Sequence, residues 1–66
     1  MDILNKADLA AYARNGFVQI RIAGTDCDGG QFDYFVQLKV EEAETWAEIQ
    51  LDWADGPMTI WVEPMR

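Results

Sequence analysis

The 66-residue sequence contains no histidine and only one cysteine, Cys27. A single cysteine cannot form an internal disulfide, and no histidine is present to join a zinc site. Cys27 is flanked by Asp26 and Asp28, whose negative charge disfavours the reactive thiolate form of the side chain. These absences predict a protein without a metal, without a cofactor and without a cysteine nucleophile.

The sequence also lacks a long apolar run and a secretory h-region. Its uninterrupted hydrophobic stretches span a few residues, whereas a membrane-spanning helix needs about 20 apolar residues. A lone thiol together with these absences is typical of a protein in a reducing compartment. We therefore expect a cytoplasmic protein that makes no contact with a membrane.

Positive charge is scarce, and its distribution is uneven. Five Lys and Arg residues stand against 12 Asp and Glu residues, for a net charge of −7. Between positions 40 and 65 there are acids and no base, namely Glu41, Glu42, Glu44, Glu48, Asp52, Asp55 and Glu63. Such a surface repels nucleic acid and anionic membranes. The expected partner is a positively charged protein surface, with no direct binding of nucleic acid.

The remaining composition indicates one small folded domain over residues 1–66. Half of the residues are hydrophobic, with three Trp, two Tyr and three Phe, which argues against a disordered acidic tail. A chain of this length buries only about 60% of its unfolded surface. Its core is therefore thin and leaves no room for a large internal cavity.

The N-terminal region predicts a helix. Asn5 is a favourable N-cap, and Asp8 follows in the first turn, near the positive end of the helix dipole. Leu4 and Leu9 occupy the positions of a hydrophobic staple around that cap. The pair Asn15-Gly16 is typical of a left-handed helix stop and predicts the end of the helix.

Hydrophobic and polar residues alternate in the segments 17–22, 32–40 and 58–63, which predicts strands. The acidic stretch "EEAETWAEIQLDWADGP" (41–57) fits two patterns. As a strand it places Ile49, Leu51 and Trp53 on a core side. As a helix its apolar stripe leaves Ile49 and Leu51 outside and consists of Ala43, Trp46, Ala47, Trp53 and Ala54. The favoured fold is α+β, with an N-terminal helix on a four-stranded antiparallel meander. The alternative has residues 41–55 helical and gives the order αββαβ.

In the favoured fold, the helix covers one face of the sheet and leaves the other face wet. The wet face combines carboxylates with exposed aromatic side chains, which is unusual for a surface that binds nothing. A solvated surface explains acids alone, but soluble surfaces normally mix both signs of charge. The predicted partner-binding residues are Glu41, Glu42, Glu44, Trp46, Glu48, Asp52, Trp61 and Glu63.

Two possible sites for chemistry fail on spacing. "DCDGGQFDYFVQ" places Asp26 and Asp28 as in a calcium loop, but Gly30 and Gln31 stand where the third acid and the turn glycine belong. Carboxylate catalysis would fall to pairs such as Glu48 and Asp52, which on a strand lie about 13 Å apart. That separation exceeds the spacing in glycosidases, so no enzymatic activity is expected.

The whole chain resembles small acidic anti-CRISPR proteins of phages and mobile elements. The likeness rests on its length, its acid bias, the opening "ADLAAYARNGFVQIRIAG" and the acidic Trp-rich segment, and it is to type I-C inhibitors in particular. The resemblance implies a stoichiometric, non-enzymatic inhibitor that acts in the cytoplasm of a bacterial host. It implies a DNA mimic that blocks target recognition by a type I CRISPR-Cas surveillance complex (Cascade), at the large subunit that reads the protospacer-adjacent motif (PAM).

Two other hypotheses remain open. An antitoxin or immunity-type protein would neutralise a basic nuclease or toxin with the same surface chemistry. Alternatively, the aromatic face would be a homodimer interface, and the first strand, with Arg21, would pair at an edge. The net charge of −7 opposes self-association across an acidic face, so a monomer is expected.

Overall fold

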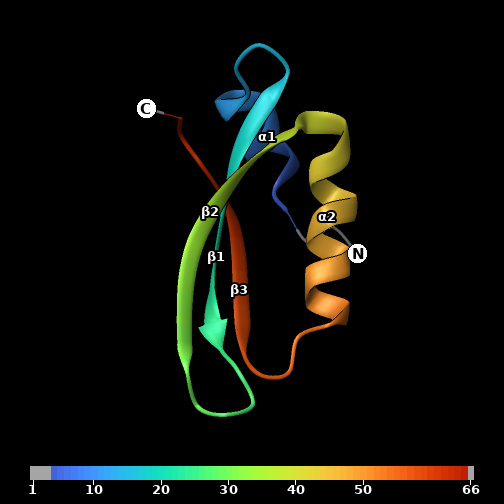
Figure 1. Ribbon diagram of the computed structural model, residues 1–66. Coiled ribbons are helices and arrows are strands. Elements are labelled where there is room, and N and C mark those ends of the chain that lie inside the picture. The colour runs from blue at the N-terminus through green and yellow to red at the C-terminus, as the bar shows by residue number, and fades with distance from the viewer. Residues whose placement is uncertain (1–3, 66) are drawn as a thin grey trace.

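The computed structural model describes residues 4–65, which fold into two helices and a three-stranded antiparallel sheet (Figure 1). The elements in chain order are α1 (Lys6–Tyr12), β1 (Phe17–Thr25), β2 (Gln31–Lys39), α2 (Val40–Asp52) and β3 (Met58–Glu63). The strand order is β2-β1-β3, so the first strand lies in the centre of the sheet. Because β2 and β3 are both antiparallel to β1, they run parallel to each other, and α2 connects them.

The α+β class is confirmed, but the four-stranded meander is wrong. Residues 40–52 form α2, and the element order is that of the αββαβ alternative. The sheet needs a cover for its apolar face, and α2 provides it through the fully buried Ala43 and Ala47. Alanine favours helix, and its small side chain allows a helix to approach the strands closely.

The three residues that the strand prediction placed on the core side do not lie in the core. Ile49, Leu51 and Trp53 are among the exposed large hydrophobic residues, so the prediction of a buried Trp53 is also wrong. Their alternation comes from positions on the outward and lateral sides of a helix. The strand prediction therefore failed because exposed apolar residues repeated with the period of a pleated strand.

The predicted N-cap of α1 is confirmed. Asn5 accepts hydrogen bonds through Oδ1 from the backbone N–H groups of Ala7, at 2.8 Å, and Asp8, at 3.2 Å. The staple residues Leu4 and Leu9 are both buried.

The pair Asn15-Gly16 does not end α1, which stops at Tyr12 with Ala13 already extended. Arg14 and Phe17 exchange two backbone hydrogen bonds, of 2.8 and 2.9 Å. The residues between them have φ angles of 53° and 83°, as a two-residue hairpin turn of type I′ requires. The left-handed pair therefore turns the chain into β1.

A hairpin loop joins β1 and β2, and Asp26 stabilises it. Its Oδ1 accepts hydrogen bonds from the backbone N–H groups of Asp28, at 3.0 Å, and Gly30, at 2.7 Å. Gly29 has a φ of 83°, in the left-handed region that glycine tolerates. The carboxylate that resembled a calcium ligand is thus engaged by the backbone of its own loop.

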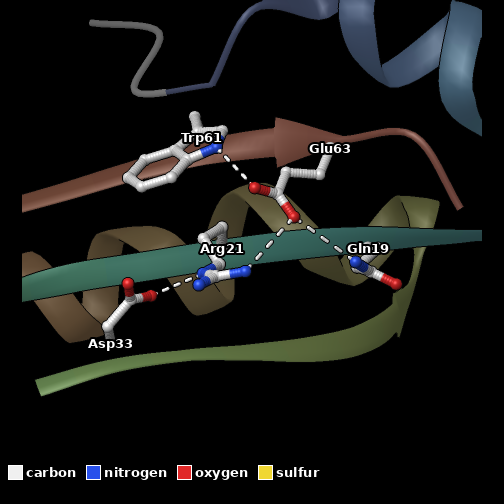
Figure 2. A network of polar contacts seen from close by, with 5 residues as sticks. All are labelled: Gln19, Arg21, Asp33, Trp61 and Glu63. Carbon is white, nitrogen blue, oxygen red and sulfur yellow. Dashed lines mark hydrogen bonds and ion pairs between the residues drawn. The ribbon is translucent and has the colours of Figure 1, made fainter.

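The core lies between the helices and one face of the sheet. Val18, Ile20 and Ile22 of β1 are fully buried there, beside Ile60 and Val62 of β3. The register places Val36 opposite Ile20, on the same face. The alternation predicted for β1 and β3 is confirmed. In β2 it is weaker, because Phe32, Val36 and Leu38 are half-buried, Tyr34 is exposed, and Val40 already belongs to α2. Within residues 4–65, the other face of the sheet carries no helix (Figures 1 and 2).

Close backbone packing fixes the connection from α2 to β3. The N–H of Thr25 donates to the carbonyl of Pro57 at 3.0 Å, and a side chain at Gly24 would collide with that same carbonyl. Within the described residues, no helix is long and apolar enough to cross a membrane.

Candidate partner-binding surface

The eight predicted contact residues lie on two different sides of the molecule. Trp61 and Glu63 belong to the sheet face that no helix covers, because they alternate with the buried Ile60 and Val62. The other six are carried by α2, on the opposite side of the sheet: Glu41, Glu42, Glu44, Trp46, Glu48 and Asp52. The prediction that the acids and the exposed indoles converge on one outward sheet surface is therefore wrong, because residues 40–52 form a helix instead of a strand.

Trp46 is also misplaced by the strand prediction. It is half-buried and packs against the core cluster from α2. An anchor for a partner must be reachable, so Trp46 serves the fold first. Glu44 is half-buried at the side of the same helix.

The acids that remain exposed on α2 form a row opposite its buried side. At about 100° per residue, Glu41, Glu48 and Asp52 point away from Ala43 and Ala47. All three are exposed. Glu48 and Asp52 are separated by one turn, about 6 Å along the helix axis. The helix thus carries a straight ridge of carboxylates on its outer side.

An apolar ridge runs beside the acidic one. Ile49 and Trp53 are four residues apart, and 43% and 78% of their surfaces are exposed. Residues at this spacing are neighbours on a helix. Glu42 lies on the same side of α2, toward its N-terminus. We call the exposed residues of both ridges the outer face of α2: Glu41, Glu42, Thr45, Glu48, Ile49, Asp52 and Trp53.

The sequence did not single out Ile49 and Trp53 as exposed candidates for a contact surface. The helical alternative already left Ile49 outside the apolar stripe, which is the signal that would have found it. It counted Trp53 within the stripe, but α2 ends at Asp52 and Trp53 is the C-cap residue. A tryptophan exposed at the end of a helix cannot be distinguished from a core tryptophan by its spacing alone.

The charges of Glu48 and Asp52 oppose the stability of the free helix. Glu41 and Glu42 lie in the first turn, where the helix dipole favours acids, but Asp52 lies in the last turn, which contains no base. Glu48 stands one turn from Glu44 and one turn from Asp52, and like charges at this spacing cost about 0.2–0.5 kcal/mol per pair. Among residues 4–65, Glu48 and Asp52 take part in no ion pair. A partner's cations would relieve this repulsion.

The uncovered sheet face is arranged in the opposite way, because its carboxylates are paired (Figure 2). We call this surface, carried by the odd-numbered residues 17–25, 31–39 and 59–63, the open sheet face. Arg21 in β1 lies between the two acids of the neighbouring strands. Its Nε donates a hydrogen bond to Asp33 Oδ1, and its Nη1 lies 3.8 Å from Glu63 Oε2.

Glu63 receives two further hydrogen bonds from the sheet. Gln19 Nε2 donates to Oε2 at 3.4 Å, and the indole Nε1 of Trp61 donates to Oε1 at 3.1 Å (Figure 2). The hydrogen bond with Asp33 raises the pKa of Arg21, and the same hydrogen bond lowers the pKa of Asp33. The predicted contact residues therefore include a pair, Trp61 and Glu63, whose side chains are hydrogen-bonded to each other within the sheet.

The structure changes one argument about catalysis. Glu48 and Asp52 lie about 6 Å apart along the helix axis, so the strand separation of about 13 Å no longer argues against a carboxylate pair. Both are exposed on the outer surface of a helix, and two shallow hollows among the described residues are lined by other side chains. In the described part of the chain, no three His, Cys, Asp or Glu side chains gather as a metal site.

Comparisons of the chain with protein-family models, with curated proteins and with solved structures gave no match.

Proposed function

We propose that the protein is a stoichiometric, non-enzymatic inhibitor that binds a basic, nucleic-acid-binding surface of another protein through the outer face of α2. The observation that carries this proposal is the combination of uncompensated acids with exposed Ile49 and Trp53 on one helix surface. The partner we propose is the PAM-reading subunit of a type I CRISPR surveillance complex in the bacterial cytoplasm. Binding there prevents the complex from recognising target DNA.

The acidic ridge supports mimicry of a nucleic-acid backbone. The exposed acids Glu41, Glu48 and Asp52 lie in a row on the outer side of α2, about 10 Å and about 6 Å apart along the helix axis. A nucleic-acid strand also presents a row of negative charges along its axis. A groove lined with Lys and Arg that holds phosphates therefore also attracts this helix.

The apolar ridge adds apolar contact area, which a row of charges does not provide. Ion pairs at the rim of an interface mainly steer association, whereas buried aromatic anchors hold the complex together. The exposed indole of Trp53 is flanked by Asp52 and, one turn earlier, by Ile49. In this proposal Trp53 enters an apolar pocket or stacks on an arginine beside the basic groove. Trp46, Trp61 and Glu63 are no longer assigned to the contact.

The test uses purified type I-C surveillance complex and PAM-containing target DNA in a mobility-shift assay. We expect one equivalent of the protein to abolish DNA binding by the complex. Glu48→Lys should weaken inhibition at least tenfold. Asp28→Lys, an exposed acid in the β1–β2 loop, changes the net charge by the same amount and should inhibit like the wild type.

Two results would reject parts of this proposal. If DNA binding persists with excess folded protein, the surveillance complex is not the partner. Rescue of cells from a coexpressed nuclease toxin would then support the antitoxin or immunity-type function, which requires the same surface. If Glu48→Lys and Asp28→Lys inhibit equally, the outer face of α2 is not the contact.

A further inference from the structure

The two edges of the sheet differ in how they are protected. β1 pairs on both sides, so the hypothesis that the first strand pairs at an edge is wrong. β3 is an edge strand of six residues between Pro57 and Pro64, and α1 lies beyond it (Figure 2). β2 is an edge strand of nine residues without proline. A long edge without proline is the kind that pairs with another strand.

The backbone groups that β2 directs to its free edge can be identified. Asp26 N donates to Gly30 O at 2.8 Å, and Val40 N donates to Gly16 O at 2.9 Å, at the two ends of the β1–β2 ladder. Hydrogen-bonded pairs alternate along an antiparallel ladder. The even-numbered residues of β2 therefore bond to β1, and the odd-numbered residues, Gln31 to Lys39, direct their N–H and C=O groups outward.

We propose that this edge of β2 pairs with the same edge of a second copy of the chain, antiparallel, about a two-fold axis at Val36. In this register Asp33 stands opposite Lys39 of the second copy, and Phe35 stands opposite Gln37. On the helix side, the exposed Tyr34 stands opposite Leu38 of the second copy.

Charge complementarity selects this register. Asp33 and Lys39 are the charged residues of β2, and both are exposed on the open sheet face. With the axis at Val36, each acid faces a base, and the contact is made twice. Asp33 already accepts a hydrogen bond from Arg21 through Oδ1, so Lys39 of the second copy would bind the other oxygen, Oδ2. A shift of the axis to Phe35 or to Gln37 places Asp33 opposite an uncharged residue or beyond the end of the strand. Opposite charges directly across two strands stabilise the pairing.

This dimer departs from the monomer expected from the net charge of −7. The edge itself is balanced in charge, and at physiological salt more distant exposed charges are screened beyond about 8 Å. The two-fold axis is perpendicular to the joined sheet, so both α2 helices lie on the same side of it. The inference rests on β2 alone and does not depend on the proposed function.

Light scattering over a concentration series tests the pairing. The wild type should approach twice the chain mass of 7.5 kDa as its concentration rises. Gln37→Pro removes an outward N–H without removing a hydrogen bond to β1, since its residue number is odd. This variant should remain at 7.5 kDa, with the circular dichroism spectrum of the wild type. Gln37→Thr, which keeps the N–H, should dimerise.

Disulfide formation tests the register. In a Cys27→Ser background, Val36→Cys should cross-link on oxidation, because opposed residues of a non-hydrogen-bonded pair have Cα atoms about 4.5 Å apart. Tyr34→Cys lies on the same edge, but its two copies would be about 13 Å apart. It should not cross-link alone and should do so when mixed with Leu38→Cys.

Three results would overturn the proposal. The first is a wild type that stays at 7.5 kDa at every concentration. The second is a Gln37→Pro variant that dimerises like the wild type, and the third is a Tyr34→Cys variant that cross-links as well as Val36→Cys. If the wild type is monomeric and Gln37→Pro no longer binds the surveillance complex, the edge of β2 would instead pair with a strand of that complex.

Discussion

The outer face of α2 and the open sheet face carry the same kinds of side chain in different arrangements. Both present carboxylates and exposed aromatic rings. On the sheet, Asp33 and Glu63 share one guanidinium and the Trp61 indole donates to Glu63, so the charges stabilise the fold. On α2, Glu48 and Asp52 repel each other and Trp53 is largely exposed.

The difference distinguishes charges that stabilise the fold through internal contacts from charges that are free to bind a partner. A carboxylate already held by an arginine and an indole gains little from a second cation. A carboxylate that repels its neighbour gains from any cation that approaches. The functional surface is therefore better identified by acids that lack an internal partner than by the density of acids.

The largest expected effect is the loss of affinity on removing the Trp53 side chain from the outer face of α2. Trp53→Ala should weaken the complex by about 2 kcal/mol, or about thirtyfold, which is typical of a central aromatic contact. Because 78% of Trp53 is exposed, the free energy of unfolding should change by less than about 0.5 kcal/mol. Isothermal titration calorimetry and urea unfolding provide the two values.

Phe35→Ala is the matched control for that change. Phe35 is 54% exposed on the open sheet face, so its truncation also removes an accessible aromatic ring. It should leave the affinity for the complex unchanged. Equal losses from both variants would remove the distinction between the two faces.

A smaller effect, with opposite signs in the two assays, is expected from Asp52→Lys. Replacing an acid by a base in the last turn should stabilise the free protein by about 0.5–1 kcal/mol, through the helix dipole and the attraction to Glu48. The same change should weaken inhibition of the complex. Asp52→Asn should give about half of each effect, and a variant that both destabilises the protein and leaves inhibition intact would contradict the assignment.

These expectations depend on a helix that the sequence did not distinguish from a strand. Ile49, Leu51 and Trp53 alternate as strand residues do, while Ala43 and Ala47 follow a helical period, and only the sheet's need for a cover decides between them. By contrast, β1 and β3 were predicted because Ile20 and Ile22 flank the polar Arg21, and Ile60 and Val62 lie between the polar Thr59 and Glu63 at a spacing of two residues.

The sequence predicts the negative charge of the candidate site but not the positions of its residues in the fold. The run of acids from Glu41 to Asp52 is visible in the sequence, and so is the absence of bases beside it. The pairing of Glu63 with Arg21 depends on the strand order β2-β1-β3, which places the two residues on neighbouring strands. No local pattern contains that information.

The smallest expected effect concerns the open sheet face at low pH. The hydrogen bond from Arg21 lowers the pKa of Asp33 in the folded state. Its contribution to stability is therefore present above the unfolded value of about 3.9 and is lost as the pH falls through the lower, folded value.

Arg21→Gln should remove that part of the pH dependence. Urea unfolding between about pH 2 and pH 6 should show a shallower loss of stability than in the wild type, and Asp33→Asn should behave similarly. Inhibition at neutral pH should be unaffected, because the open sheet face is not the proposed contact. An unchanged pH profile in both variants would show that this ion pair contributes nothing to the fold.

Cross-saturation NMR tests the central claim most directly, with isotope-labelled protein bound to the unlabelled PAM-reading subunit. The account predicts signal loss at backbone amides of α2 and its C-cap, from Glu41 to Trp53, with little loss in β1 and β3 around Arg21 and Trp61. Signal loss centred on β1 and β3, with the α2 signals preserved, would contradict it.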